Sequence, residues 1–132
     1  MTATDGAAPP PNEVVVVVPV YRSTTDAFET LSLDRAFAAL RDRPIVMIKP
    51  RGLDTGAVEN GRPFAAVETF DPSYFRSIKD YNRLLLSTEF YERFASYRYL
   101  LICQLDVFVF RDDLSSWAAR GYDYVGAPWL SK

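Results

Sequence analysis

The stretch "EVVVVVPV", Glu13 to Val20, holds six valines and one proline. A continuous run of β-branched residues is typical of a strand that is buried on both faces, as strands of a parallel sheet are. Pro19 stands near the end of the run, where the loss of one backbone N–H from the ladder is tolerable. The run therefore predicts a buried strand of a parallel sheet.

Helical and strand patterns alternate downstream of this run. Thr24 to Asp26 offers helix-start residues, and apolar residues then recur at roughly helical spacing: Phe28, Leu31, Ala36, Phe37 and Leu40. An amphipathic helix is therefore expected from Asp26 to Arg41, ended by Pro44. Ile45 to Ile48, "IVMI", predicts a second buried strand, and the Gly-containing segment 51–63 predicts a loop.

The second half of the chain continues this alternation. We expect a weak strand at Phe64–Phe70, one broken helix or two short ones at Ser73–Phe94 with Ser87 as an N-cap, a strand at Tyr99–Gln104, a short helix at Asp113–Arg120 and a final strand at Tyr122–Ala127. This order favours an α/β fold with a mostly parallel sheet flanked by helices. The runs at Val14, Ile45 and Leu100 should lie side by side in it, with the Leu100 strand at the centre.

Composition limits the classes of protein to consider. The chain of 132 residues suits one domain, and 48% of its residues are hydrophobic, so it can bury a core. A net charge of −2 gives no electrostatic reason to expect nucleic-acid binding. No segment approaches the ~20 consecutive apolar residues of a membrane span. Residues 1–12, "MTATDGAAPPPN", lack the pattern of a secretory signal and predict a disordered tail, which leaves 13–132 as the domain.

Cysteine and histidine exclude further classes. The single cysteine, Cys103, cannot form an internal disulfide and suits a reducing, cytoplasmic compartment. It stands inside an apolar run, which predicts a small buried hydrophobe. The chain holds no His, so Ser–His or Cys–His catalysis within it is excluded, as is a zinc site built on His.

A second stretch, "LLICQLDVFVF" from Leu100 to Phe110, places one carboxylate between two apolar runs. A buried charge is costly unless it is paired or binds a metal. Asp106 therefore either ends the strand and caps the next turn, or it has a ligand. In α/β sheets the ligand lies at the carboxyl ends of the strands, near the point where strand order reverses, and this favours the ligand role.

Three stretches together resemble a known family. They are "VVVPVYRS" from Val16, "YNRLLLSTEFYERF" from Tyr81 and "YRYLLICQLDVFVFRDDLSSWAARGYDYVGAPW" from Tyr97. The chain from about Val14 to Trp129 resembles the DUF5672 family, a group related to GT-A glycosyltransferases, and its layout is similar to that of retaining enzymes of the glycogenin type. The resemblance implies a GT-A-like, Rossmann-like nucleotide-binding half that takes a nucleotide-sugar donor.

The same resemblance gives Asp106 a specific role. GT-A enzymes carry a D-x-D motif at the end of a central strand, and "QLD" looks like that motif with Gln104 in place of the first Asp. The resemblance implies that Asp106 is a metal ligand. A hard divalent cation, Mn²⁺ or Mg²⁺, would bridge it to the diphosphate. Gln104 could offer a neutral oxygen or a hydrogen bond to the ribose.

Other positions follow from the resemblance. Pro19 and Tyr21 end the first strand where GT-A folds hold the nucleotide base, so Tyr21 either stacks on the base or is a core or turn aromatic. Arg83 in "YNRL" resembles an Arg that approaches the diphosphate or donor sugar, the alternative being an exposed helical Arg. Asp112 and Asp113 fit helix capping better than metal binding.

The resemblance also implies a missing part. GT-A enzymes of this type continue into an acceptor-binding half that often supplies a His ligand, whereas this sequence stops at "APWLSK" without a His. We therefore expect a shortened domain with no nameable catalytic base, an unknown glycan or small-molecule acceptor, and an exposed apolar patch that promotes self-association. The alternative is a non-catalytic remnant or interaction module that keeps the fold without turnover. A phospho-receiver or phosphatase fits poorly, since the first strand end has no acidic pair.

Overall fold

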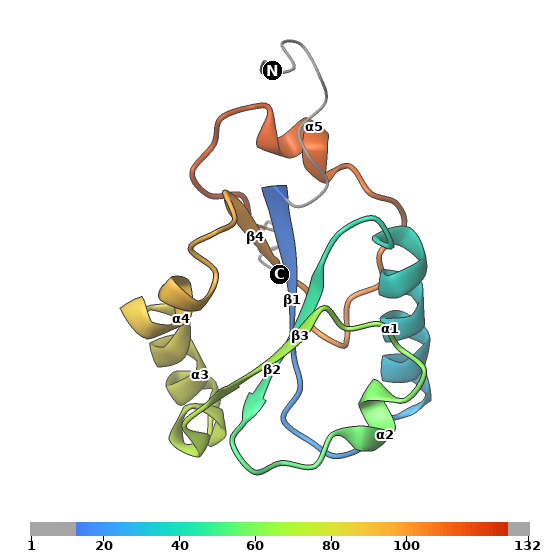
Figure 1. Ribbon diagram of the computed structural model, residues 1–132, viewed down its shortest axis with the longest axis vertical. Coiled ribbons are helices and arrows are strands. Elements are labelled where there is room, and N and C mark those ends of the chain that lie inside the picture. The colour runs from blue at the N-terminus through green and yellow to red at the C-terminus, as the bar shows by residue number, and fades with distance from the viewer. Residues whose placement is uncertain (1–12, 127–132) are drawn as a thin grey trace, which may run out of the picture.

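The computed structural model describes residues 13–126 (Figure 1), so the predicted tail at 1–12 and residues 127–132 lie outside the described part. Four strands form one sheet in the order β3-β2-β1-β4: β1 (Val14–Pro19), β2 (Ile45–Pro50), β3 (Ala66–Phe70) and β4 (Tyr99–Ile102). All three strand pairs are parallel. The predicted α/β fold with a parallel sheet flanked by helices is confirmed.

Strand β1 is buried on both faces, as its valine run predicts. Val16 and Val18 pack into a cluster under helix α1 (Ala27–Ala39). Val15 and Val17 pack into a second cluster under α3 (Ile78–Leu85) and α4 (Thr88–Arg93). Side chains alternate between the faces of a strand, so a strand covered on both sides needs apolar residues at every position.

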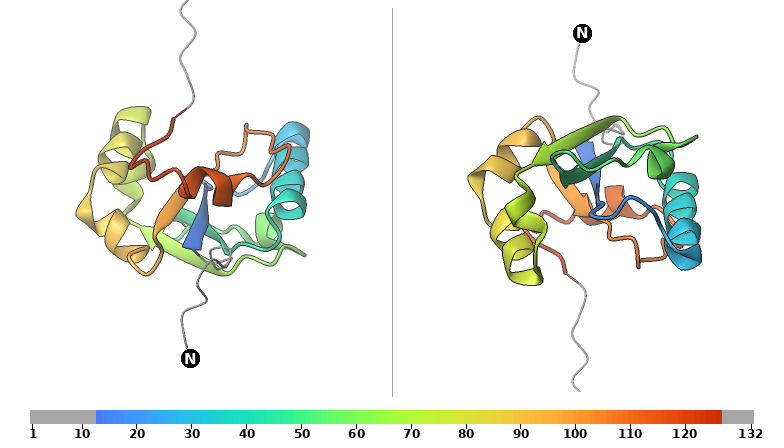
Figure 2. Two further views of the ribbon diagram at one scale, coloured as in Figure 1. Left: turned by 90° about the horizontal axis from the view of Figure 1, so that it is seen from above. Right: turned by 90° about the horizontal axis from the view of Figure 1, so that it is seen from below.

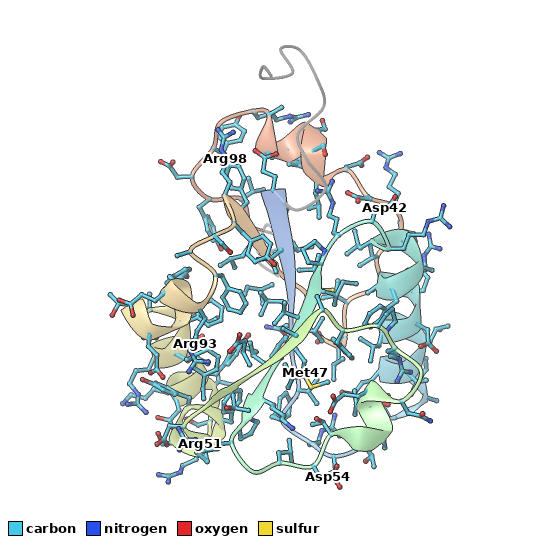
Figure 3. All side chains as sticks on the ribbon, in the orientation of Figure 1. Asp42, Met47, Arg51, Asp54, Arg93 and Arg98 are labelled. Atoms are coloured by element: carbon cyan, nitrogen blue, oxygen red, sulfur yellow. The ribbon has the colours of Figure 1, made fainter. Side chains whose placement is uncertain are left out.

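The helices cover the two faces separately. In both views of Figure 2, α1 lies on one side of the sheet while α3 and α4 lie on the other. Figure 3 shows Met47 of β2 in the centre of the molecule and Arg93 on the α4 side. The predicted pair of short helices after Pro72 is confirmed as α3 and α4, preceded by a 3-10 turn, η2 (Pro72–Phe75). Ser87 is the N-cap of α4, since its hydroxyl accepts the Phe90 N–H.

The apolar face of α1 differs from the one that the sequence predicts. Phe28 is 82% exposed and Leu31 is 57% exposed. The buried face keeps the predicted Ala36, adds Leu33, and also includes two polar side chains, Glu29 and Ser32. Glu29 can lie there because it completes a capping box with Asp26 and pairs with an arginine, so its burial is compensated.

The position of β4 and the predicted last strand are two further corrections. Among the described residues β4 pairs with β1 alone, so it lies at the sheet edge and β1 and β2 occupy the centre. Residues 122–126, the described part of the predicted final strand, form no strand and are exposed. The chain instead leaves the sheet after β4 and returns along α1, where residues 109–112 contact Arg35 and Arg43.

Two arginines of the α1 region hold this returning segment in place. Arg35 Nε donates to the Val109 carbonyl oxygen at 2.8 Å, and Arg43 pairs with Asp112 through two bonds of 2.7 and 3.0 Å. The segment ends in α5 (Leu114–Ala118), where Gly121 takes the left-handed conformation, φ 73°, that closes a helix. The remaining short helix, α2 (Gly56–Glu59), lies within the segment 51–63 that the sequence predicts to be a loop. Of the predicted apolar patch, Val125 is 54% exposed, while Trp129 and Leu130 lie outside the described residues.

Candidate functional site

The strand order reverses between β1 and β4. The chain steps from β1 to β2 and β3 on one side, then crosses to the other side of β1 to form β4. The strands run downward in Figure 1, so their carboxyl ends lie at the lower edge, where Figure 3 labels Arg51 and Asp54 after β2. In open parallel sheets a crevice forms outside the carboxyl ends of the two strands that flank such a reversal.

A cleft of about 590 Å³ lies at this place. Four parts of the chain line it: the end of β1, Glu29 of α1, the turn after β4, and α3 with the residues before it. Its lining residues are Pro19, Tyr21, Glu29, Phe75, Arg76, Ser77, Ile78, Tyr81, Asn82, Leu85, Gln104, Leu105 and Asp106. Four of the five binding residues predicted from the sequence, Pro19, Tyr21, Gln104 and Asp106, therefore lie in one cleft.

The β1 wall presents Tyr21 on a fixed support. Backbone pairing continues past the strand, because the Val20 N–H donates to the Ile48 carbonyl at 2.9 Å. The Tyr21 side chain is 56% exposed, and the Arg22 guanidinium lies 5.6 Å from its ring centroid. Glu29 holds that guanidinium through contacts of 2.6 and 2.7 Å, which raise the Arg22 pKa above its usual value. The Tyr21 ring thus lines the cleft with the Arg22 guanidinium close to it.

The β4 wall carries an acidic residue shortly after a strand that is half-buried along its whole length. The Cys103 N–H still pairs with the Val17 carbonyl at 2.9 Å, and a turn follows in which the Val107 N–H donates to the Gln104 carbonyl at 3.1 Å. Leu105 is buried against the α1-side core, whereas Gln104 and Asp106 are exposed. Burial alternates along the motif, so the side chains of Gln104 and Asp106 are exposed and both line the cleft.

Asp106 has no protein partner in the described part of the chain. No hydrogen bond or ion pair among residues 13–126 involves its carboxylate, and the turn is closed by backbone atoms alone. The carboxylate therefore does not cap the turn, and it lies exposed to solvent after the end of the strand. Asp112 behaves as a structural acid instead: burial alone would raise its pKa, but the hydrogen bonds from Arg43 and the Leu114 N–H outweigh burial and lower it. The two aspartates thus have different surroundings.

The α3 wall contributes residues that sequence analysis did not select. Its cleft-facing stripe is Ile78, Tyr81, Asn82 and Leu85, at the i, i+3, i+4, i+7 spacing of one helical face. Arg76 precedes the helix and lines the same cleft. Arg76 carried no family motif, but its place just before a helix that follows a strand is a signal that could have identified it.

Arg83, the fifth predicted binding residue, does not line the cleft. Its guanidinium lies 3.5 Å from the Asp80 carboxylate, one turn back on α3, and 4.8 Å from the Tyr74 ring centroid. Its side chain is 58% exposed. A residue next to Asn82 is rotated by about 100° around the helix axis, which turns Arg83 away from the stripe that faces the cleft.

The acidic groups of the cleft limit how a metal could bind. No cluster of three or more His, Cys, Asp or Glu residues suited to a metal occurs in the described part of the chain. Of the two acidic residues in the lining, Glu29 has both oxygens bound to Arg22, which leaves Asp106 available. One carboxylate beside the Gln104 amide fits a cation that takes its other ligands from phosphate oxygens and water, as Mg²⁺ commonly does.

These features define a class: an α/β protein with a Rossmann-like parallel sheet and a cleft at the carboxyl ends of β1 and β4. The family described as "Protein of unknown function (DUF5672)" matches residues 64–132, just over half of the chain. The chain belongs to this family. No curated protein and no solved structure matches it. The matched part includes the α3 and β4 walls of the cleft, while Pro19 and Tyr21 precede it.

None of the described helices is both long and apolar enough to cross a membrane.

Proposed function

We propose that this chain binds the diphosphate of a nucleotide sugar in the cleft between β1 and β4, as the nucleotide-binding part of a GT-A-type glycosyltransferase. The observation that supports this most is Asp106. It is an exposed carboxylate without a partner among the described residues, beside Gln104 at the strand-order reversal. Water can solvate an exposed carboxylate, so the support comes from its position in a cleft at the strand-order reversal, where parallel sheets bind their ligands.

The rest of the lining suits the two ends of a nucleotide. Tyr21, Phe75 and Leu85 offer apolar and aromatic surface on which a base can stack. Arg76 and Asp106 offer a cation and a metal-ligating carboxylate, which serve a diphosphate. A divalent cation held by Asp106, with the Gln104 amide oxygen beside it, would neutralise charge on the leaving nucleoside diphosphate as a glycosidic bond breaks.

The chain supplies binding groups more clearly than catalytic ones. No described residue of the cleft stands as a catalytic base, because Glu29 is occupied by Arg22 and Asp106 is assigned to the metal. Hexosyl transfer to an acceptor is therefore tested separately from binding.

The "QLD" motif favours one alternative function. Replacing the first carboxylate of D-x-D by Gln104 removes one negative charge from the metal site and weakens its hold on a cation. A domain that retains the fold and binds a nucleotide or a partner protein without turnover would tolerate this loss. The two functions differ in a measurable way, because only the enzyme releases nucleoside diphosphate from a nucleotide sugar.

Isothermal titration calorimetry of the full chain with UDP, GDP, CDP and dTDP, each with and without Mn²⁺, tests the proposal. We expect one or two of these nucleotides to bind, and to bind more tightly with Mn²⁺. Absence of binding for all four, with a folded chain by circular dichroism, would contradict it. Where binding occurs, incubation with the matching nucleotide sugars and detection of free nucleoside diphosphate decides between turnover and binding alone.

A further inference from the structure

Tyr81 carries a polar atom that the fold leaves unsatisfied. Two buried side-chain oxygens in the described part of the chain lack a hydrogen-bond partner, Glu13 Oε2 and the Tyr81 hydroxyl. The Glu13 carboxylate is still compensated, because its other oxygen lies 3.0 Å from an Arg98 nitrogen, and Figure 3 places Arg98 at the edge of the molecule opposite the cleft. The Tyr81 hydroxyl has no such compensation, and Tyr81 lines the cleft.

An unsatisfied hydroxyl at this position needs an explanation. Leaving a buried hydroxyl without a partner costs about 1–3 kcal/mol. A phenylalanine would pack the same ring against the α3-side core, where Tyr81 makes its apolar contacts, without that cost. The ring alone therefore does not account for a tyrosine in the cleft-facing stripe of α3, between Ile78 and Leu85.

The hydroxyl is a neutral donor under all ordinary conditions. Burial raises the pKa of Tyr81 to about 12, and the nearby Tyr21 contributes to the shift. The phenol therefore stays protonated across the physiological range. Tyr21 and Tyr81 both line the cleft, one after β1 and the other on α3.

We propose that Tyr81 is a binding residue of this cleft and donates a hydrogen bond from its hydroxyl to an oxygen of the nucleoside, on the base or the ribose. This inference rests on the proposed nucleotide binding and adds the residue that recognises the nucleoside. The nucleoside, and not the diphosphate, is the partner because the α3 residues that line the cleft with Tyr81 are uncharged: Ile78, Asn82 and Leu85. A neutral donor among such groups suits a neutral acceptor, whereas an anion there would lose solvation without gaining a counter-charge.

The test compares Tyr81→Phe with the wild-type chain by calorimetry in Mn²⁺, using whichever of UDP, GDP, CDP and dTDP binds best, and inorganic pyrophosphate as a second probe. We expect the affinity for the nucleotide to fall about tenfold, the upper end of what one hydrogen bond contributes. The affinity for pyrophosphate should not change. Tyr91→Phe is the matched control, because Tyr91 lies on α4 outside the cleft, and it should leave both affinities unchanged.

Each other outcome contradicts the inference in a distinguishable way. Equal nucleotide affinities for Tyr81→Phe and wild type would overturn the role of Tyr81 while leaving nucleotide binding established. An equal loss for nucleotide and pyrophosphate would show that the hydroxyl acts on the diphosphate or on the shape of the cleft, and would overturn the assignment to the nucleoside. A wild-type chain that binds no nucleotide would overturn this inference and the proposed function together.

Discussion

Two corners of the same sheet edge differ in whether their polar side chains have hydrogen-bond partners. At the carboxyl ends of β2 and β3, Lys49 donates to the Leu53 carbonyl at 2.8 Å and lies 3.1 Å from the Thr55 hydroxyl, which donates to Glu59 at 2.8 Å. Thr55 is 1% exposed. This corner is closed by its own side chains.

The corner at β1 and β4 is open. Asp106 and the Tyr81 hydroxyl both have no partner among the described residues, and both line the cleft. The same topology thus produces a satisfied corner, where polar groups hold the loop, and an unsatisfied one, where they remain available. Buried polar groups in native proteins are normally paired, so the buried Tyr81 hydroxyl is the group of this corner that calls for an explanation, while Asp106 is exposed to solvent.

The largest effect is expected from Asp106→Asn, which removes the available carboxylate of the open corner. Changes next to metal ligands alone cost metal sites 10–100-fold, so losing the ligand itself should cost at least about 100-fold in Mn²⁺-dependent nucleotide affinity. The melting temperature should hardly move, since the carboxylate makes no contact that stabilises the fold. Calorimetry and thermal melting measure the two quantities.

Two further variants test whether the effect of Asp106→Asn comes from the loss of a metal ligand. Asp42→Asn is the control, because Figure 3 places Asp42 at the opposite edge of the molecule, and it should bind as wild type does. Gln104→Asp restores the second carboxylate of the motif and should tighten Mn²⁺ binding. A large drop in melting temperature for Asp106→Asn would mean that the open corner is structural after all.

A change in the closed corner at β2 and β3 should lower stability and leave nucleotide affinity unchanged. Thr55→Val keeps the shape of the side chain but removes the oxygen that joins Lys49 to Glu59, leaving two charged groups short of a partner. We expect the free energy of unfolding in urea to fall by about 2–3 kcal/mol, with nucleotide affinity unchanged. Thr24→Val, at an exposed position before α1, should change neither. Loss of nucleotide affinity in folded Thr55→Val would show that the two corners are coupled.

Alkaline pH tests whether the Tyr81 hydroxyl is shielded from water, as its burial indicates. The Tyr81 pKa is about 12 in the folded chain and near 10 when unfolded, so the unfolded chain loses its proton first. Stability from this group is therefore complete below pH 10 and falls as pH rises through 12, by about 3 kcal/mol for a difference of about two pKa units. Urea unfolding at several pH values should show a shallower fall for Tyr81→Phe than for wild type. Identical slopes would place the hydroxyl in water.

The smallest effects are expected from two arginines near α3, Arg76 before the helix and Arg83 within it. Arg76→Ala should weaken nucleotide binding about tenfold, as expected for a charge-assisted hydrogen bond to the diphosphate. Arg83→Ala should change it less than about twofold, because Arg83 pairs with Asp80 on the exposed side of α3 and such surface pairs contribute little. The reverse order of effects, measured by calorimetry in Mn²⁺, would restore the role that the family resemblance gives to Arg83.

Local sequence predicted the elements of the fold well, with failures of one kind. Strands β1, β2 and β4 and helices α1, α3 and α4 all lie within or close to the ranges expected from periodicity and capping residues. The failures concern which residues face the core and which strands lie inside. Phe28 and Leu31 are apolar yet exposed, whereas the polar Glu29 and Ser32 of the same helix are buried.

The candidate site was predictable as far as strand ends determine it. Residues that immediately follow a parallel strand must emerge at the carboxyl edge, so Tyr21 after β1 and Asp106 after β4 could be placed there from the sequence. Arg76 and Tyr81 could not be selected in this way. Their position in the cleft depends on how α3 lies across the sheet, which no pattern within α3 encodes.

The sequence by itself determined that this chain builds a parallel sheet covered on both faces, because a run of valines without a polar position has no face to turn to water. It also determined that a carboxylate ends the strand at 99–102. Only the tertiary structure decided that β4 lies at the edge, that Arg83 turns away while Arg76 faces the cleft, and that the Tyr81 hydroxyl is left without a partner. Those outcomes depend on contacts between segments far apart in the chain, where the packing of one element sets the surroundings of another.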